Sequence, residues 1–441
     1  MRSIIDIPIS KFDEDEFKIG PYIEGLSEFI GECDTPMTIA VQGDWGCGKT
    51  SMMQMVRDIL VEKDVIIPVW FNTWQFSQFN LDDRLVLTFL SRLEKELRST
   101  VSGEEGKVIA EKVKKTCVSV MAAAAEHFIG GEAADLIKNG VEVEDKTASD
   151  MLLELKNSFN DLIQAACKEK NKRVVIFVDD LDRLHPVRSI ELLEVLKLFL
   201  DCRNCVFVLA IDTSVVFQGI REKYGHDISE SKAQSFFDKL IQLPFKMPIN
   251  YYKLDKMISE KLDFLDPAAS EDKQLIKLIT NTTSKNPRAI KRLINSYCLI
   301  DKVTEKKGMY VGSPEKSRLI RKMILTLSCM QISEESLYNS LLKDYGTLAQ
   351  DIDFLLARKD VWTRRKANKE TREEQITELE KRGFEFDEPI ESEKIWEVIS
   401  GFITIVADII SHYRKAEGKT EEESLKLLCG IINMNGIDDA M

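Results

Sequence analysis

The sequence lacks any long uninterrupted apolar run. Its most apolar tracts are residues 118–125 and 402–410. Both fall far short of the roughly 18 to 20 residues that a helix needs to span a bilayer. The amino-terminal segment MRSIIDIPISKFDEDEF has too short an apolar stretch and too many acids for a secretory signal peptide. The sequence therefore predicts a cytoplasmic protein with no integral membrane segment.

A surplus of positive charge is also absent. The formal net charge is -13, whereas a protein that coats nucleic acid needs clustered Lys and Arg to neutralise phosphates. Hydrophobic residues make up 44% of the chain and charged residues 31%, which is the balance of a globular protein. We expect a folded chain that is not basic overall.

The nine cysteines form no disulfide or zinc framework. Cys202 and Cys205 make a lone C-x-x-C motif, and no second pair follows at zinc spacing. We expect both to be small buried residues. Another cysteine, Cys47, lies in a glycine-rich loop, and a reduced setting fits this distribution.

Short apolar runs alternate with helical periodicity over the first 250 residues. This alternation predicts an α/β fold with a parallel sheet and helices on both of its faces. Pro68 places its run at a sheet edge or a bulge. Residues 100–148 interrupt the pattern and are interpreted as an insertion. The expected strands cover residues 37–41, 65–71, 173–178, 206–211 and 242–247.

After residue 250 the sequence has helical periodicity and no convincing strand. We expect three parts: an α/β core at 1–250, a helical lid at 251–312 and a helical C-terminal domain at 313–441. Residues 364–382 mix acids and bases, which is typical of a solvated helix face. The C-terminal domain lies outside the motifs below, so we expect it to act as a sensor or to bind a protein partner.

Residues 43–50, GDWGCGKT, fit the phosphate-binding loop G-x4-G-K-[ST]. Glycines let the backbone point its N–H groups at phosphates, and the helix that begins near Lys49 adds positive potential. Lys49 is expected to bridge the β- and γ-phosphates, and the hydroxyl of Thr50 to bind Mg²⁺. The residues expected to contact the nucleotide are Gly43, Asp44, Trp45, Gly46, Cys47, Gly48, Lys49, Thr50 and Ser51.

Three aspartates follow the apolar run at 173–178. Asp179 is expected to be the second Mg²⁺ ligand, beside Thr50. Asp180 is expected to orient or deprotonate the attacking water, and Asp182 is counted as catalytic with Lys49, Asp179 and Asp180. Three acids at one strand end repel each other unless a cation lies there. The two motifs together predict a magnesium-dependent nucleoside triphosphatase.

Three positions beside these motifs keep two interpretations each. Arg183 could neutralise the acids or reach a neighbouring subunit as an arginine finger, and the first is the more ordinary role. Asp212 and Thr213 could sense the γ-phosphate, or Thr213 or Ser214 could cap the next helix.

A further basic pair lies in the helical part. Asn286 precedes a helix with Pro287 in its first turn, and Arg288 or Arg292 could reach the nucleotide from there. The alternative is a solvated basic face. Arg288 is the residue we count as catalytic.

These motifs together resemble the KAP family of P-loop ATPases, a branch of the additional-strand class related to the STAND and AAA+ groups. The resemblance covers roughly residues 15–300. The segments that carry it are GDWGCGKT at 43–50, FNTWQF at 71–76, DDLDR at 179–183, QLPF at 242–245, and NPR at 286–288 with Lys291 and Arg292.

The resemblance implies a conformational or assembly switch that uses ATP and Mg²⁺ and forms a homo-oligomer. It also implies an extra strand between the strand that ends in the phosphate loop and the strand that carries the acids. Many family members have transmembrane helices between the two nucleotide motifs, whereas residues 100–148 occupy that place without an apolar span. Bacterial relatives often belong to phage-exclusion or other defence systems, which implies such a role here.

Three hypotheses follow. The leading one is an ATP-hydrolysing switch, in which ATP is chosen from the resemblance because no Asn-Lys-x-Asp-like base-reading motif is present. The second is a scaffold that binds nucleotide without turnover to hold its C-terminal helices in position. The third and less favoured is a nucleic-acid-dependent ATPase, suggested by the local bases Arg364, Arg365, Lys366 and Lys369.

Overall fold

The structure of the chain is a computed structural model that describes residues 4–77, 85–101, 108–109, 111–113, 115–116, 148–170, 172–199, 202–225, 228–263, 267–310, 313–363, 369–387, 393–418 and 420–435. The chain divides into two compact units. The sheet unit comprises Pro8–Asp15 and Ile19–Pro248, and the helical unit comprises Met1–Ile7, Glu16–Lys18 and Ile249–Met441. The predicted division between a lid and a C-terminal domain near residue 312 stays a prediction.

A five-stranded parallel sheet forms the centre of the sheet unit, with the strand order β2-β3-β4-β1-β5. All five predicted strands are confirmed, and β2, which contains Pro68, lies at an edge as expected. The strand β4 lies between β1 and β3, which is the extra strand that the family resemblance implied. The strands are β1 (Met37–Gln42), β2 (Ile66–Asn72), β3 (Arg173–Asp179), β4 (Cys205–Ile211) and β5 (Leu243–Lys246).

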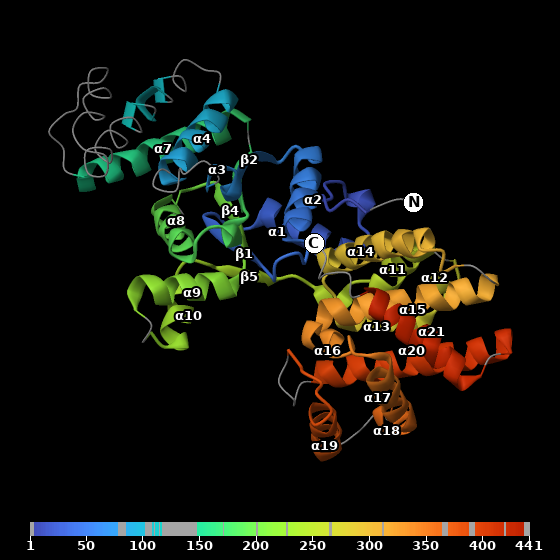
Figure 1. Cartoon of the computed structure of the whole chain (residues 1–441). Coiled ribbons are helices and arrows are strands. Elements are labelled where there is room, and N and C mark those ends of the chain that lie inside the picture. The colour runs from blue at the N-terminus through green and yellow to red at the C-terminus, as the bar shows by residue number, and fades with distance from the viewer. Residues whose placement is uncertain are drawn as a thin grey trace. The chain divides into compact units, whose positions relative to one another are not determined.

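Helices cover both faces of this sheet (Figure 1). One face packs against α2 (Lys49–Glu62), which α1 (Gly20–Glu32) contacts in turn, and the other against α4 (Leu85–Thr100), α7 (Ala148–Lys170) and α8 (Pro186–Phe199). The central strands are buried on both faces, which explains why β3 and β4 are almost continuously apolar. This buried scaffold fixes the carboxyl ends of the strands along one edge.

The edge strand β2 is joined to the second helical layer by aromatic packing. Phe71 meets Phe89 of α4 edge to face, with ring centroids 5.1 Å apart, and both side chains are buried. The other elements of the sheet unit are α3 (Thr73–Ser77), α9 (Thr213–Tyr224), α10 (Glu230–Asp238) and the 3-10 turns η1 (Phe12–Glu14) and η3 (Leu181–Arg183). Most of the predicted insertion at 100–148 lies outside the described residues.

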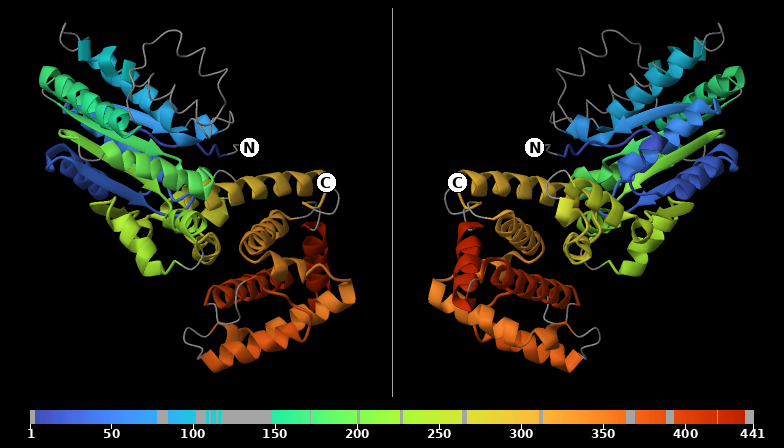
Figure 2. Two further views of the ribbon diagram at one scale, coloured as in Figure 1. Left: turned by 90° about the vertical axis from the view of Figure 1, so that its left-hand side faces the viewer. Right: turned by 90° about the vertical axis from the view of Figure 1, so that its right-hand side faces the viewer.

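The helical unit contains no strand among its described residues, as predicted (Figures 1 and 2). Gly401 lets α20 approach α13 closely, because a Cβ atom there would lie 2.8 Å from Leu278 Cδ1. Trp362 and Trp396 pack against each other beside them, with ring centroids 4.4 Å apart. The helices of this unit are α11 (Leu254–Asp263), α12 (Pro267–Ser270), α13 (Lys273–Thr282), α14 (Pro287–Lys306), α15 (Pro314–Ser333), α16 (Glu335–Asn339), α17 (Tyr345–Ala357), α18 (Lys359–Trp362), α19 (Lys369–Glu380), α20 (Glu393–Glu417) and α21 (Glu421–Asn435).

One described helix, α20, is long and apolar enough to cross a membrane by length and composition alone. The stretch Ile395–Lys415 spans 21 residues. The uninterrupted apolar run 402–410 is too short to span a bilayer, but the wider stretch is long enough, so the prediction from length is wrong for α20. However, 56% of the apolar window is buried, as in the core helix of a soluble protein, and α20 packs against α15 and α13. The absence of an integral membrane segment therefore stays a prediction, now supported by packing.

Candidate active site

The phosphate-loop motif connects the end of β1 to the start of α2, as the sequence predicts. Gly48 caps α2 with a left-handed backbone, φ 102°, which glycine adopts without strain. Gly43 is needed for a different reason: a Cβ atom there would lie only 2.6 Å from Cys47 Sγ. The Gly43 amide donates to the carbonyl of Ile211 on the neighbouring strand at 3.2 Å. The loop is therefore compact and anchored to the sheet.

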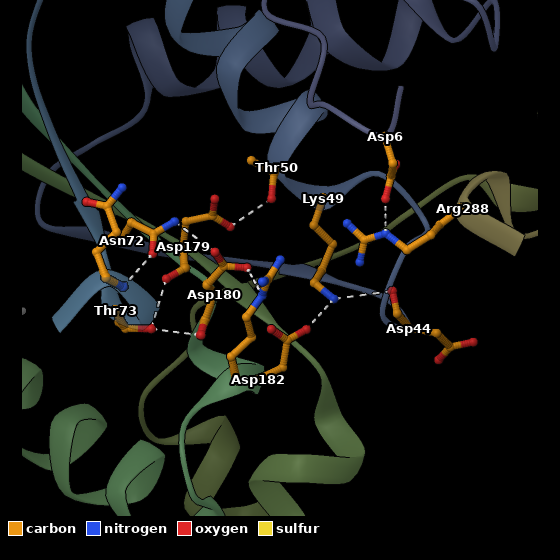
Figure 3. A network of polar contacts seen from close by, with 12 residues as sticks. Asp6, Asp44, Lys49, Thr50, Asn72, Thr73, Asp179, Asp180, Asp182 and Arg288 are labelled. Carbon is orange, nitrogen blue, oxygen red and sulfur yellow. Dashed lines mark hydrogen bonds and ion pairs between the residues drawn. The ribbon is translucent and has the colours of Figure 1, made fainter. Parts of the chain in front are cut away.

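The ammonium group of Lys49 lies inside this loop (Figure 3). It donates to the carbonyl oxygens of Gly43 at 2.7 Å and Asp44 at 3.3 Å, and to Asp182 Oδ2 at 2.8 Å. The side chains of Lys49 and Asp182 are only 7% and 5% exposed. A buried ion pair thus joins the phosphate-loop motif to the acidic motif.

A second contact joins the same two motifs. Thr50 Oγ1 donates to Asp179 Oδ1 at 3.1 Å. The other oxygen, Asp179 Oδ2, is buried and has no hydrogen-bond partner among the described residues. Burial, and then the neighbouring charge of Asp180, raise the pKa of Asp179 to about 6, against the opposing effect of the Thr50 hydrogen bond.

These two side chains fit a magnesium ion. Carboxylate and hydroxyl oxygens are the ligands that Mg²⁺ prefers, and a buried carboxylate with one unsatisfied oxygen gains most from a nearby cation. Thr50 and Asp179 are the residues that would hold the ion. No group of three or more His, Cys, Asp or Glu side chains suited to another metal occurs in the part of the chain that the structure describes.

Asp180 follows Asp179 with a left-handed backbone, φ 59° and ψ 29°, which is strained for a residue other than glycine. Side chains from β2 and α3 hold it there. Asn72 Nδ2 donates to Asp180 Oδ2 at 2.7 Å, and Thr73 Oγ1 donates to the carbonyls of Asp179 at 3.1 Å and Asp180 at 2.7 Å. The turn that carries the acids is therefore fixed by its neighbour strand.

Arg183 neutralises the acidic turn, the more ordinary of its two predicted roles. Its Nε lies 2.7 Å from Asp180 Oδ1, and its guanidinium lies over the ring of Trp74, 4.5 Å from the centroid. Both carboxylate oxygens of Asp180 are thus engaged, one by Asn72 and one by Arg183.

The remaining predicted loop residues differ in their surroundings. Asp44 and Trp45 are exposed, and the Ser51 hydroxyl accepts a hydrogen bond from the Ile9 amide at 3.1 Å. Cys47 is 3% exposed. Burial raises the pKa of its thiol despite the nearby charge of Lys49, so Cys47 acts as a packing residue of the loop.

Neither predicted cap of α9 is correct. The helix is capped by Asp212, whose Oδ1 accepts from the Ser214 amide at 3.0 Å and the Ser214 hydroxyl at 2.6 Å. Asp212 lies between β4 and α9, so its carboxylate is the nearest side-chain acceptor for the exposed N–H groups of α9. Thr213 is the first residue of α9.

Arg288 belongs to the helical unit. It lies in the first turn of α14, which Asn286 caps by accepting from the amides of Arg288 at 3.0 Å and Ala289 at 3.2 Å. Its guanidinium forms an ion pair with Asp6, which Lys291 also approaches at 3.8 Å. A role for Arg288 at the nucleotide stays a prediction.

Sequence reasoning did not assign roles to Asn72 and Thr73. Both belong to the aromatic motif FNTWQF at 71–76. A signal was available: the carboxyl ends of parallel strands meet at one edge of a sheet, and Asn72 pairs in register with Asp179. Polar residues that follow a neighbouring strand were therefore candidates for contacts with the acids.

Comparison with known proteins identifies two similarities. Residues 19–303 match the model of the KAP family P-loop domain. The chain is also similar to the phage T7 exclusion protein of Escherichia coli (strain K12), with 20% identity over an alignment of 268 residues. The match covers 55% of this chain and 34% of that protein. The chain thus spans about a third of the length of this curated relative.

Proposed function

The chain belongs to the KAP family of P-loop domain proteins, and from this premise we propose that it is a magnesium-dependent ATPase that works as an assembly switch. The observation that carries the proposal is the pair of contacts between the two nucleotide motifs, Lys49 to Asp182 and Thr50 to Asp179. They bring a cation, a hydroxyl and a buried carboxylate to one sheet edge, which is the set of groups that phosphoryl transfer requires.

Each residue would have a distinct role. The loop amides and Lys49 would bind the β- and γ-phosphates and stabilise the charge that develops there. Thr50 and Asp179 would hold Mg²⁺, which supplies further neutralisation of the phosphate oxygens. Asp180 would orient the attacking water or accept its proton once Arg183 has released one of its carboxylate oxygens.

Phosphate release tests the proposal directly. Purified protein is supplied with ATP or GTP and Mg²⁺, beside Asp180→Asn, while light scattering follows its mass with and without nucleotide. We expect turnover in the parent protein, nucleotide binding without turnover in the variant, and an increase in mass with ATP. Equal turnover in both proteins would show that Asp180 has been assigned wrongly.

A scaffold without intrinsic turnover is the second candidate. It is favoured by the engagement of both Asp180 oxygens, because a carboxylate held by Asn72 and Arg183 is not available to a water. Thermal stabilisation by Mg-ATP with no phosphate release under any condition would support it. Nucleic-acid dependence is favoured less: Lys369 pairs with Glu373 at 3.4 Å, and Arg364, Arg365 and Lys366 lie outside the described residues.

For the biological role we propose only a general process. The name of the Escherichia coli relative concerns phage exclusion, which supports a role in antiviral defence. We further propose that the protein is a cytoplasmic homo-oligomer that binds a protein partner through its C-terminal helices. Nucleotide-dependent mass and co-purification of a partner with residues 313–441 in the intact chain would test these assignments.

A further inference from the structure

We propose that Asp182 takes the place of a phosphate on Lys49 in the nucleotide-free protein, so that a nucleotide binds by displacing this carboxylate. The inference rests on the proposed function, since it concerns the same site. Asp182 then has a role different from that of a catalytic residue. It lowers the affinity of the loop for ligands and favours those with enough negative charge to displace it from Lys49.

The hydrogen bonds of Lys49 are the first argument. An ammonium group has three N–H donors. All three have acceptors within the chain: the carbonyls of Gly43 and Asp44 and the carboxylate of Asp182. Asp182 is the acceptor among them with a full negative charge, so it is the group that an anionic phosphate oxygen would replace.

Burial is the second argument. The two side chains are 7% and 5% exposed, so solvent screens their attraction little and neither charge can be left alone without a large cost. Lys49 therefore needs an anion at all times. In the absence of a ligand Asp182 is that anion, and a polyphosphate competes for the same cation.

The surrounding charges determine what can compete. Asp179 ends β3 and Asp180 precedes the turn that holds Asp182, so an arriving ligand adds negative charge to a site that already holds three carboxylates. Asp182 must leave Lys49 for the ligand to gain that contact, because two anions on one ammonium repel each other. A ligand with clustered phosphate charge achieves this exchange more readily than a monoanion.

The backbone provides a route for the displacement. Asp182 lies in the short turn η3, which begins after the strained backbone of Asp180. The carbonyl of Leu181 in this turn accepts from Ser189 Oγ of α8 at 2.8 Å. If the backbone of Asp182 moves with its side chain, η3 changes, and η3 is bonded directly to α8 through the Leu181 carbonyl.

Asp182→Asn tests the displacement, because asparagine keeps the shape and removes the charge. Calorimetric titration with pyrophosphate, and with ATP in EDTA, is expected to show about tenfold tighter binding in the variant, equivalent to about 1.4 kcal/mol. Without ligand the variant is expected to unfold at a lower temperature, because Lys49 has lost its anion. The two effects have opposite signs, which a simple loss of structure would not produce.

Glu194→Gln is the matched control. It removes the carboxylate that Lys223 Nζ contacts at 2.6 Å elsewhere in the sheet unit. We expect its affinity for pyrophosphate to equal that of the parent protein.

A measurement on the parent protein alone covers the case in which Asp182→Asn does not fold. Pyrophosphate is expected to speed hydrogen exchange at the Arg183 and Leu184 amides, which bond within η3, and slower exchange would overturn the inference.

The outcomes separate the two proposals. If the parent protein binds pyrophosphate and Asp182→Asn binds it equally or more weakly, the displacement is wrong and the nucleotide site stands. If neither protein binds pyrophosphate or ATP, the proposed function fails and the displacement fails with it.

Discussion

The hydroxyl of Thr73 donates to the carbonyl oxygen of Asp180 at 2.7 Å, across more than a hundred residues of sequence. It also reaches the carbonyl of Asp179 at 3.1 Å. Thr73 follows the edge strand β2, Asp179 ends β3 and Asp180 follows it, so one buried hydroxyl joins the ends of two neighbouring strands. The positions of the candidate metal ligand and the candidate base both depend on this contact.

Thr73→Val tests that dependence. Valine keeps the shape and removes both hydrogen bonds, so we expect the sheet unit to lose about 1 to 3 kcal/mol of stability and turnover to fall more than nucleotide affinity. Thr73→Ser keeps the hydroxyl and should retain turnover. If Thr73→Val and Thr73→Ser lose turnover equally, Thr73 acts through packing and not through its hydrogen bonds.

Asp179 gives a pH dependence of known sign. Its pKa is raised to about 6 in the folded protein, so the folded state binds more protons than the unfolded state between the ordinary value and about 6. The free energy of unfolding is therefore expected to fall by up to about 3 kcal/mol as pH rises through that window, and then to level off. Mg²⁺ should oppose this loss because it favours the ionised carboxylate.

Asp179→Asn removes this dependence. Urea unfolding in EDTA at about pH 5 and about pH 7.5 should show that the variant gains stability relative to the parent protein at the higher pH. The variant should also lose the stabilisation that Mg²⁺ gives with nucleotide. If the difference in unfolding free energy between the two proteins does not change with pH, the pKa of Asp179 is not raised in the folded state.

Gly43→Ala should block phosphate binding by crowding the loop. The added Cβ would lie 2.6 Å from Cys47 Sγ and 3.1 Å from Met247 Cγ. Cys47→Ala alone should bind nucleotide like the parent protein, since Cys47 acts as a packing residue. The double variant should recover part of the affinity, because the nearest clash has been removed. Full affinity in Gly43→Ala would contradict the described loop packing.

Arg288 and Asp6 can be tested as a pair. If Arg288 acts at the nucleotide, Arg288→Ala should lower turnover about tenfold, whereas Asp6→Asn should leave it intact or raise it because the guanidinium is released. If Arg288 instead stabilises the helical unit through its ion pair with Asp6, both variants should lower the thermal stability of that unit by similar amounts and leave turnover unchanged. Phosphate release and thermal unfolding of both variants decide between these roles.

The parts of the fold with a strong local signal were predictable from sequence. The strands β3 and β4 are continuous apolar runs, and their burial on both faces in a parallel sheet follows from that pattern. The edge position of β2 followed from Pro68, because proline cannot donate to a sheet ladder. The phosphate-loop motif predicted the positions of Gly48 and Lys49, because its spacing follows from the geometry needed to bind phosphate.

The contacts within the site were less predictable. Lys49 and Asp182 are 133 residues apart in sequence, and their ion pair depends on the left-handed turn at Asp180, which no periodicity reveals. For α9 the sequence suggests a cap by Thr213 or Ser214 as one of two interpretations, whereas the carboxylate of Asp212, one position nearer the strand, is the cap. In both cases the deciding factor is the direction of the backbone where a strand ends.

Calorimetric titration with Mg-ATP tests the central claim most directly, using the parent protein, Lys49→Ala and Lys63→Ala. Lys63 is an exposed residue at the other end of α2 and serves as the matched control. The account predicts saturable binding to the parent protein and to Lys63→Ala, and affinity at least about a hundredfold weaker, or about 2.7 kcal/mol, in Lys49→Ala. Binding of Mg-ATP to Lys49→Ala with the affinity of the parent protein would contradict it.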